Sequence, residues 1–163
     1  MMSGLIAARG LLMAAGLIGA GFVAMPLPGP PDFSGTWTLN VPRSDFGPFP
    51  APERRTDVIE HRDGTLKLTR REVNASGQER VGEWTCKTDG VECTNTMGRT
   101  QMRSTARWEE TTLVVATKTT YEGQDASVED RWVISPDGRT LTISRSAVSP
   151  QGTAHQTFVL ERQ

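Results

Sequence analysis

The feature that most constrains this chain is a succession of short segments of alternating polarity, separated by glycine-containing turns. Runs rich in threonine and valine recur from Thr56 onward at roughly 8–12-residue spacing, which is typical of an antiparallel sandwich or barrel. The turns between them are Asp63-Gly64, Asn74–Gly77, Asp89-Gly90, Glu109–Thr111, Gly123-Gln124, "SPDG" and "SPQG". No segment keeps apolar residues at i, i+3, i+4 and i+7 over three helical turns. The pattern predicts an all-β fold of about ten strands, and its hairpin-length connections favour a meander.

Residues 1–25 have the composition of a secretory signal. One arginine, Arg9, precedes an apolar run from Leu11 to Met25 that carries small residues near its end. This run is shorter than the about 20 residues that a membrane-spanning helix needs. We therefore expect a signal peptide at 1–25, a proline-rich linker at 26–32 and a β domain at 33–163, with a periplasmic or secreted location. A retained N-terminal anchor is the alternative.

The two cysteines, Cys86 and Cys93, flank the turn signal Asp89-Gly90. A two-residue hairpin at this turn would place them directly opposite each other on neighbouring strands. Their Cα atoms would then be about 5.5 Å apart, a distance that a disulfide accepts. Because exported thiols oxidise, we predict a structural disulfide; a redox or metal site is the alternative.

Charge and composition exclude some classes of partner. The chain has 18 basic and 19 acidic residues, for a net charge of −1, and they are spread along its length. Without a basic patch or stripe, no nucleic-acid partner is expected. Hydrophobic residues make up only 36% of the sequence, and some of them lie in residues 1–25, so the core must be thin. We expect a monomer with no membrane span in the mature protein.

Three tryptophans, Trp84, Trp108 and Trp132, are spaced 24 residues apart. This period corresponds to two strands and two turns, so each indole would return to a like-directed strand near the same end of the sheet. The spacing favours core aromatics that pack under turns. Stacking on a ligand is the alternative.

The alternation within strands predicts faces that begin apolar and end polar. Leu66 and Leu68 share a face with Arg70, and Leu141 and Ile143 share one with Arg145. In a closed barrel this pattern would give one dry end and one wetter end. In a sandwich it would give solvated strand ends. Each assignment depends on register, because a shift of one residue inverts the face.

The opening segment "FSGTWTLN" resembles the first strand of calycins, the superfamily of lipocalins and fatty-acid-binding proteins. Its Gly35, Thr36 and Trp37 match the shared glycine, any residue, tryptophan triplet, and the closing "FVLERQ" supplies a late arginine, Arg162. The wider stretch is similar to exported bacterial lipocalin-like proteins of unknown role. The resemblance implies an up-and-down barrel of about 8–10 strands. It also implies that Gly35, Trp37 and Arg162 close one end, with the guanidinium packed across the indole.

Two departures from that family bear on function. The segment Val41–Arg55 contains four prolines, so it should be irregular and cannot form the helix-turn-helix lid of fatty-acid-binding proteins. Phe158 and Leu160 occupy the places of the arginine and tyrosine that bind a fatty-acid carboxylate there. We therefore do not expect the carboxylate site of fatty-acid-binding proteins in this chain.

The sequence contains no recognisable catalytic or metal motif. His61 and His155 are the only histidines, and they combine with the two cysteines in no metal-ligand spacing. A haem site through His155 has no supporting residues around it. Carboxylates such as Glu72 and Asp130 could pair across strands, which is a common structural role. We predict no catalytic residue, metal or cofactor, and an enzyme is the least favoured class.

Two functions remain for an exported barrel of this kind. It could bind a small apolar or amphipathic ligand, or it could be a filled structural or interaction domain of the cell envelope. In the first case Arg70, Arg103 and Arg145 would meet the polar head group of the ligand at the mouth of the barrel. The ligand-binding candidates are then Leu66, Leu68, Arg70, Arg103, Leu113, Val115, Trp132, Leu141, Ile143 and Arg145. An internal cavity of about 300 Å³ or more would favour the first function, and a filled interior the second.

Overall fold

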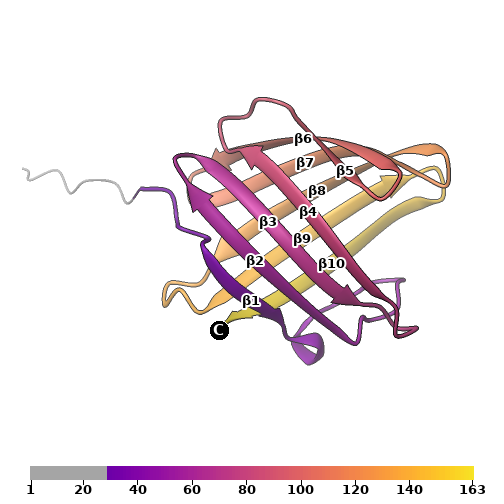
Figure 1. The fold of residues 1–163 in the computed structure, drawn as a ribbon, viewed down its shortest axis with the longest axis horizontal. Helices are drawn as coiled ribbons and strands as arrows, with labels where there is room; N and C mark the ends of the chain where they lie inside the picture. The colour runs from indigo at the N-terminus through magenta and orange to yellow at the C-terminus, as the bar shows by residue number, and fades with distance from the viewer. Residues whose placement is uncertain (1–28) are drawn as a thin grey trace, which may run out of the picture.

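Ten antiparallel strands form one sheet that curves round into a nearly closed barrel (Figure 1). The structure is a computed structural model and describes residues 29–163. The strands are β1 (Gly35–Leu39), β2 (Arg54–Arg62), β3 (Thr65–Val73), β4 (Glu79–Lys87), β5 (Cys93–Met97), β6 (Thr100–Glu109), β7 (Thr112–Tyr121), β8 (Gln124–Ile134), β9 (Thr140–Ser149) and β10 (Gly152–Arg162). The predicted signal segment 1–25 lies outside the described residues, as does the first part of the linker.

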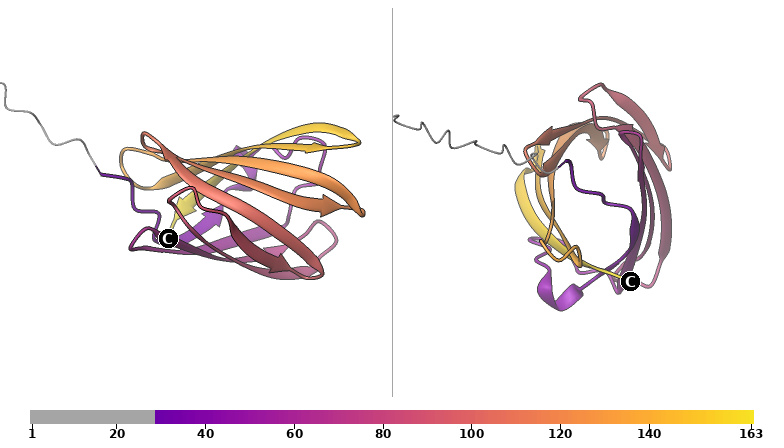
Figure 2. Two further views of the ribbon diagram at one scale, coloured as in Figure 1. Left: turned by 90° about the horizontal axis from the view of Figure 1, so that it is seen from above. Right: turned by 90° about the vertical axis from the view of Figure 1, so that its left-hand side faces the viewer.

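Strands that follow one another in the chain are hydrogen-bonded neighbours, except for β4 and β5, which lie at the two edges of the sheet. The order across the sheet is β4-β3-β2-β1-β10-β9-β8-β7-β6-β5, so the first and last strands pair at a β1–β10 junction. Figure 2 shows the strands arranged as a ring when the barrel is seen from one end. The predicted all-β meander of ten strands is confirmed. β2 begins at Arg54, slightly before the expected start of regular structure at Thr56.

Trp37 closes one part of the barrel interior. It is fully buried, and its indole N–H donates to the Phe33 carbonyl at 2.9 Å. The Arg162 guanidinium lies 4.4 Å from the centre of the indole ring and donates to the carbonyls of Ser34 and Gly138. Gly35 has φ +139°, and a Cβ there would lie 3.0 Å from the Arg162 guanidinium. The glycine therefore makes room for the arginine that covers the tryptophan.

Aromatic side chains fill the interior next to Trp37. Phe33 is fully buried, stacks on Trp108 with ring centres 5.7 Å apart, and meets Trp132 edge-on at 5.8 Å. His61 packs against Phe33 and Trp108. Two of the three regularly spaced tryptophans thus meet around one phenylalanine, as the core interpretation of that spacing predicts. The rest of this dry region consists of aliphatic residues, among them Leu66, Leu113, Leu141, Ile143 and Leu160.

The proline-rich segment after β1 lies beside β10. It contains the short 3-10 helix η1 (Val41–Arg43) and otherwise has irregular structure. Asp45 and Thr157 exchange two backbone hydrogen bonds of 2.8 Å, and Phe46 packs against the Phe158 ring at 6.0 Å. The segment is therefore held to the barrel by backbone pairing and one aromatic contact.

Cys86 and Cys93 form a disulfide with Cα atoms 5.5 Å apart, at the predicted separation. The predicted two-residue hairpin between them is wrong, however. No backbone ladder joins β4 to β5 anywhere in residues 29–163, and the two strands are the edges of the sheet. The connection 88–92 bonds elsewhere instead: the Thr88 N–H donates to the Gly64 carbonyl, and the Gly90 N–H to the Ala106 carbonyl.

The region where β4 and β5 face each other, residues 82–86 and 93–97, is called the β4–β5 seam below. Besides the disulfide, one side chain bridges it. Asn95 accepts from the Thr85 N–H at 2.8 Å and donates to the Thr85 carbonyl at 3.0 Å, which imitates one rung of a backbone ladder. The seam is therefore closed by side chains, whereas every other junction of the sheet is closed by backbone.

Candidate functional site

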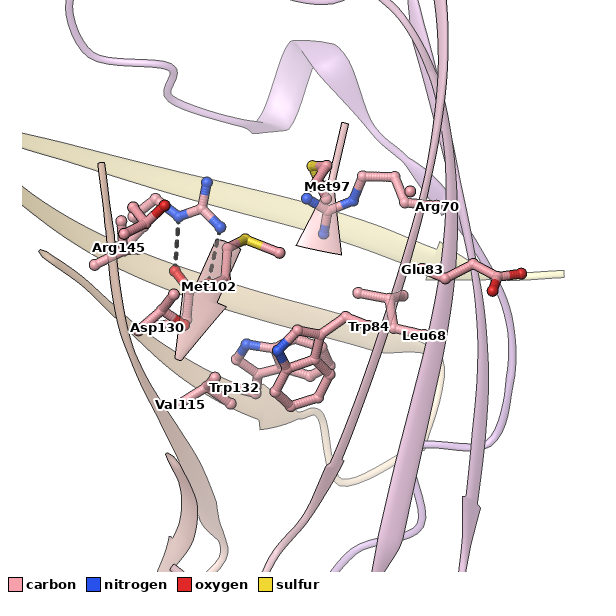
Figure 3. A pocket seen from close by; sticks show the side chains of 14 residues that line it. Leu68, Arg70, Glu83, Trp84, Met97, Met102, Val115, Asp130, Trp132 and Arg145 are labelled. Atoms are coloured by element: carbon pink, nitrogen blue, oxygen red, sulfur yellow. Dashed lines mark hydrogen bonds and ion pairs between the residues drawn. The ribbon is translucent and has the colours of Figure 1, made fainter. Parts of the chain in front are cut away.

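A cavity of about 210 Å³ lies inside the barrel between β3, β4 and β5 on one side and β6 to β9 on the other. Its apolar wall consists of Leu68, Trp84, Met97, Met102, Val115 and Trp132. Arg70, Asp130 and Arg145 contribute charged groups. Figure 3 shows the two guanidinium groups on one side of the cavity and the two indole rings on the other. The cavity is thus amphipathic.

The two indoles differ in their hydrogen bonds. The Trp84 N–H donates to the Ser104 hydroxyl at 3.2 Å, and Ser104 also bonds to the Thr117 hydroxyl at 2.8 Å. Trp132 is only 3% exposed, and its N–H has no partner among the described residues. A buried donor without a partner is costly, by about 1–3 kcal/mol. The wall of the cavity therefore carries one unsatisfied donor.

Arg145 and Asp130 form a bidentate ion pair at the charged side of the cavity. They lie opposite each other on β9 and β8, and the Arg145 Nε and Nη2 donate to the carboxylate at 2.7 and 2.8 Å. Burial by itself lowers the pKa of Arg145, but the charge and hydrogen bonds of Asp130, together with the charges of Asp57 and Glu72, outweigh burial and raise that pKa above its ordinary value. The pair is a fixed feature of the site at neutral pH.

A second ionic group lies deeper and places two arginines on one carboxylate. Asp57 is fully buried and accepts from Arg55, which is 2% exposed, with a shortest contact of 2.6 Å. Asp57 also accepts from Arg70 at 3.0 and 3.1 Å. Burial alone would raise the pKa of Asp57, but Arg70 and Arg55 outweigh it and hold that pKa well below its usual range. Burial, and then the charge of Arg70, lower the pKa of Arg55 to about 10, so it stays protonated at neutral pH.

Phe158 connects the two ionic groups. The Arg55 guanidinium lies 4.9 Å from the centre of its ring, and the Arg145 guanidinium lies 5.1 Å from it. A ring between two cations gains from each contact, by about 0.5–2 kcal/mol depending on desolvation. Phe158 therefore belongs to the charged layer of the interior, although it is apolar.

The structure brings together half of the predicted ligand-binding residues. Leu68, Arg70, Val115, Trp132 and Arg145 line the cavity. Leu66, Leu113, Leu141 and Ile143 are buried in the dry region and do not line it. The prediction that Arg103 binds the ligand in the barrel is wrong. Arg103 is exposed on the outer face of β6, because its neighbours Met102 and Ser104 point inward.

The prediction missed several residues that build the site. Arg55 and Asp57 were not expected because Arg55 was assigned to the irregular segment, although the alternation of Arg55, Asp57, Ile59 and His61 in β2 carried the signal. Met97 was missed because the hairpin assignment misplaced β5, and Met102 was missed because its neighbour Arg103 on β6 was chosen in its place. Asp130 was noted only as a carboxylate that could pair across strands, which it does.

The cavity reaches the surface region of the β4–β5 seam. Gly82 and Met97 both line it, and Met97 is 44% exposed. A Cβ at Gly82 would lie 2.7 Å from the Met97 methyl carbon, so the glycine leaves space for the methionine to lie across the seam. At this place the cavity wall is a flexible side chain rather than a paired strand.

Comparison with known proteins places the fold. The structure is similar to that of the zebrafish ileal bile acid-binding protein in complex with cholic acid, with a TM-score of 0.54 and 16% sequence identity. The match covers 80% of this chain and 98% of that protein. This chain therefore shares the β-barrel fold of that protein. No protein-family model matches the sequence, and no curated protein matches it. At this identity the likeness establishes the fold alone.

Within residues 29–163, no three His, Cys, Asp or Glu side chains come together as a metal site. In the same range, no helix is long and apolar enough to cross a membrane. His61 packs among aromatic rings, and His155 is exposed on β10.

Proposed function

We propose that this barrel binds one small amphipathic molecule in its interior cavity. The observation that carries the proposal is a cavity of about 210 Å³ with an apolar wall on one side and two arginines on the other. A purely structural core would be expected to fill such a space, because interiors pack to nearly crystalline density. The fold supports the proposal, since the similar zebrafish protein was solved with cholic acid.

The size of the cavity limits the ligand. An engineered apolar cavity of about 150 Å³ binds benzene, and pockets for drug-sized molecules begin at about 300 Å³. The cavity here, at about 210 Å³, lies between these sizes and below the about 300 Å³ expected above for a ligand-binding barrel, so its amphipathic lining rather than its volume supports the proposal. It therefore suits one or two rings or a short chain, and it is too small for a long acyl chain.

We also propose that the protein works outside the cytoplasm. The signal-like segment 1–25 and the Cys86–Cys93 disulfide support this location. In that setting the barrel would hold its ligand in the periplasm or in the surrounding medium.

The test is native mass spectrometry of the protein purified without denaturation. Val115, buried in the cavity wall, is replaced by phenylalanine to fill the cavity, and the exposed outer valine Val133 is replaced in the same way as the matched control. We expect a small non-covalent adduct on the wild type and on Val133→Phe, and its loss in Val115→Phe. An adduct that survives in Val115→Phe, or bare protein in all three samples, would contradict the proposal and favour a filled structural domain.

A further inference from the structure

The charged side of the cavity holds more guanidinium groups than carboxylates in direct contact. Arg55, Arg70 and Arg145 are joined by ion pairs to only Asp57 and Asp130. Glu72 lies opposite Arg55 in the β2–β3 ladder and forms no ion pair within residues 29–163, but its charge also raises the pKa of Arg145. Three carboxylates therefore balance the three guanidinium groups, and only two of them bind the guanidinium groups directly.

The arginines that line the cavity have donors to spare. Arg70 uses its Nε and Nη2 on Asp57, and Arg145 uses the same two nitrogens on Asp130. A guanidinium carries five N–H donors, and the Nη1 groups of both residues have no hydrogen bond within the described chain. Their side chains are 20% and 24% exposed, so they are accessible from the cavity. An anionic oxygen is the acceptor that such donors bind best.

The apolar side of the cavity adds a second, independent indication of a polar occupant. The Trp132 N–H is buried and lacks a partner, while the neighbouring Trp84 N–H is satisfied by Ser104. An occupant with a hydrogen-bond acceptor could satisfy Trp132, whereas a pure hydrocarbon could not. Both sides of the cavity therefore favour a ligand that carries polar oxygens.

We infer that the ligand is a small organic anion, with its charged group bound by Arg70 and Arg145 and its apolar part packed against Trp84 and Trp132. This inference rests on the proposed function and names the class of ligand. It differs from the fatty-acid carboxylate site described above, because its arginines come from β3 and β9 rather than from the last strand.

The experiment compares anions with uncharged molecules of the same shape. The probes are 2-naphthoate, trans-cinnamate and octanoate, each paired with its amide, and the dissociation constants are measured by calorimetry and by tryptophan fluorescence. We expect at least one anion to bind tenfold or more tightly than its amide. Palmitate and cholate should bind more weakly than that anion.

Substitutions then test whether Arg70 and Arg145 cause the preference for the anion over its amide. In Arg70→Gln, and in the double variant Asp130→Asn/Arg145→Gln, the anion and its amide should bind within about twofold of each other. The double variant replaces a buried ion pair by an uncharged pair, so it leaves no lone charge and keeps the test available if Arg70→Gln fails to fold. Arg103→Gln is the matched control, because it removes one exposed arginine from the outer face of β6 and should keep the preference.

Three outcomes would overturn the inference. The first is equal or tighter binding of the amides, which would leave the proposed ligand-binding function intact. The second is a charge preference that persists in both cavity variants but disappears in Arg103→Gln. The third is no binding by any of the three anions; native mass spectrometry of the purified protein then shows separately whether the proposed function also fails.

Discussion

The β1–β10 junction and the β4–β5 seam close the same barrel by different means. At the junction, backbone pairing runs from Trp37 and Arg162 to Leu39 and Leu160, and the guanidinium of Arg162 covers the indole of Trp37. At the seam, a disulfide, one asparagine and one methionine span two edge strands. The interior beside Trp37 is filled, and the cavity lies against the seam.

The β1–β10 junction and the β4–β5 seam should also differ in stability and in freedom to move. A backbone ladder opens only when several hydrogen bonds break together, so the junction should be among the most protected parts of the fold. Side chains that span a gap can move one at a time. The barrel thus has a rigid region that fixes its shape and a more adaptable region where, under the proposed function, a ligand would enter.

The largest expected effect is at the junction, on replacing Trp37 by alanine. A fully buried indole is lost, and large-to-small changes of this kind cost about 3–5 kcal/mol. Urea denaturation should show the free energy of unfolding reduced by that amount. Trp37→Phe, which keeps a ring in the site, should lose clearly less. If Trp37→Ala lost under about 1 kcal/mol, the junction would not be the rigid region described above.

The next effect is at the seam, on removing the disulfide with Cys86→Ser/Cys93→Ser. The closed loop is short, with a sequence separation of 7, so the chain-entropy model gives a loss of about 2.5 kcal/mol. Hydrogen exchange should accelerate in β4 and β5 and stay unchanged in β1 and β10. Equal acceleration at both places would remove the distinction between them.

A smaller effect is expected for Arg162→Ala. It removes the cation–π contact with Trp37 and two hydrogen bonds to backbone carbonyls, which together are worth about 1–2 kcal/mol at a partly exposed site. Arg162→Lys should not restore the stability, because an ammonium lacks the planar fork that reaches both carbonyls. Full rescue by lysine in thermal unfolding would show that only the charge matters.

The smallest effect on stability is expected for Gly82→Ala at the seam. The new methyl group displaces the flexible end of Met97, so the free energy of unfolding should change by only about 0.5 kcal/mol or less. The association rate of 2-naphthoate, measured by stopped-flow fluorescence, should nevertheless rise severalfold, because the side chain across the seam has moved. Val81→Ala, on the exposed face of β4, is the control that should leave the rate unchanged.

The strand pattern could be predicted from the sequence because turn residues and alternation are local properties. Alternation placed Leu68, Arg70 and Arg145 on inward faces, and the terminal resemblance placed Arg162 near Trp37. The inward faces needed no knowledge of which strands pair over long distances, whereas the contact between Arg162 and Trp37, at the two ends of the barrel domain, came from the resemblance.

The seam could not be predicted in this way. The Asp89-Gly90 turn signal is strong, yet β4 and β5 do not pair, and their connection bonds instead to Gly64 in the β2–β3 turn and to Ala106 within β6. Arg103 was predicted to meet a polar head group at the mouth of the barrel, but the alternation of Met102 and Ser104 places it on the outer face. The Asp57 cluster was missed because Arg55 was assigned to the irregular segment, and because the pairing of β2 with β3 that brings Arg70 to Asp57 was not considered.

The claim that a small organic anion binds inside the barrel is tested most directly by a crystal structure of the protein with the anion that binds most tightly among the three probes. The account predicts density for the ligand inside the barrel, with its charged group within hydrogen-bond distance of Arg70 and Arg145 and its apolar part against Trp84 and Trp132. A ligand bound instead on the outer face of the sheet, near Arg103 and Lys118, with side chains filling the interior cavity, would contradict it.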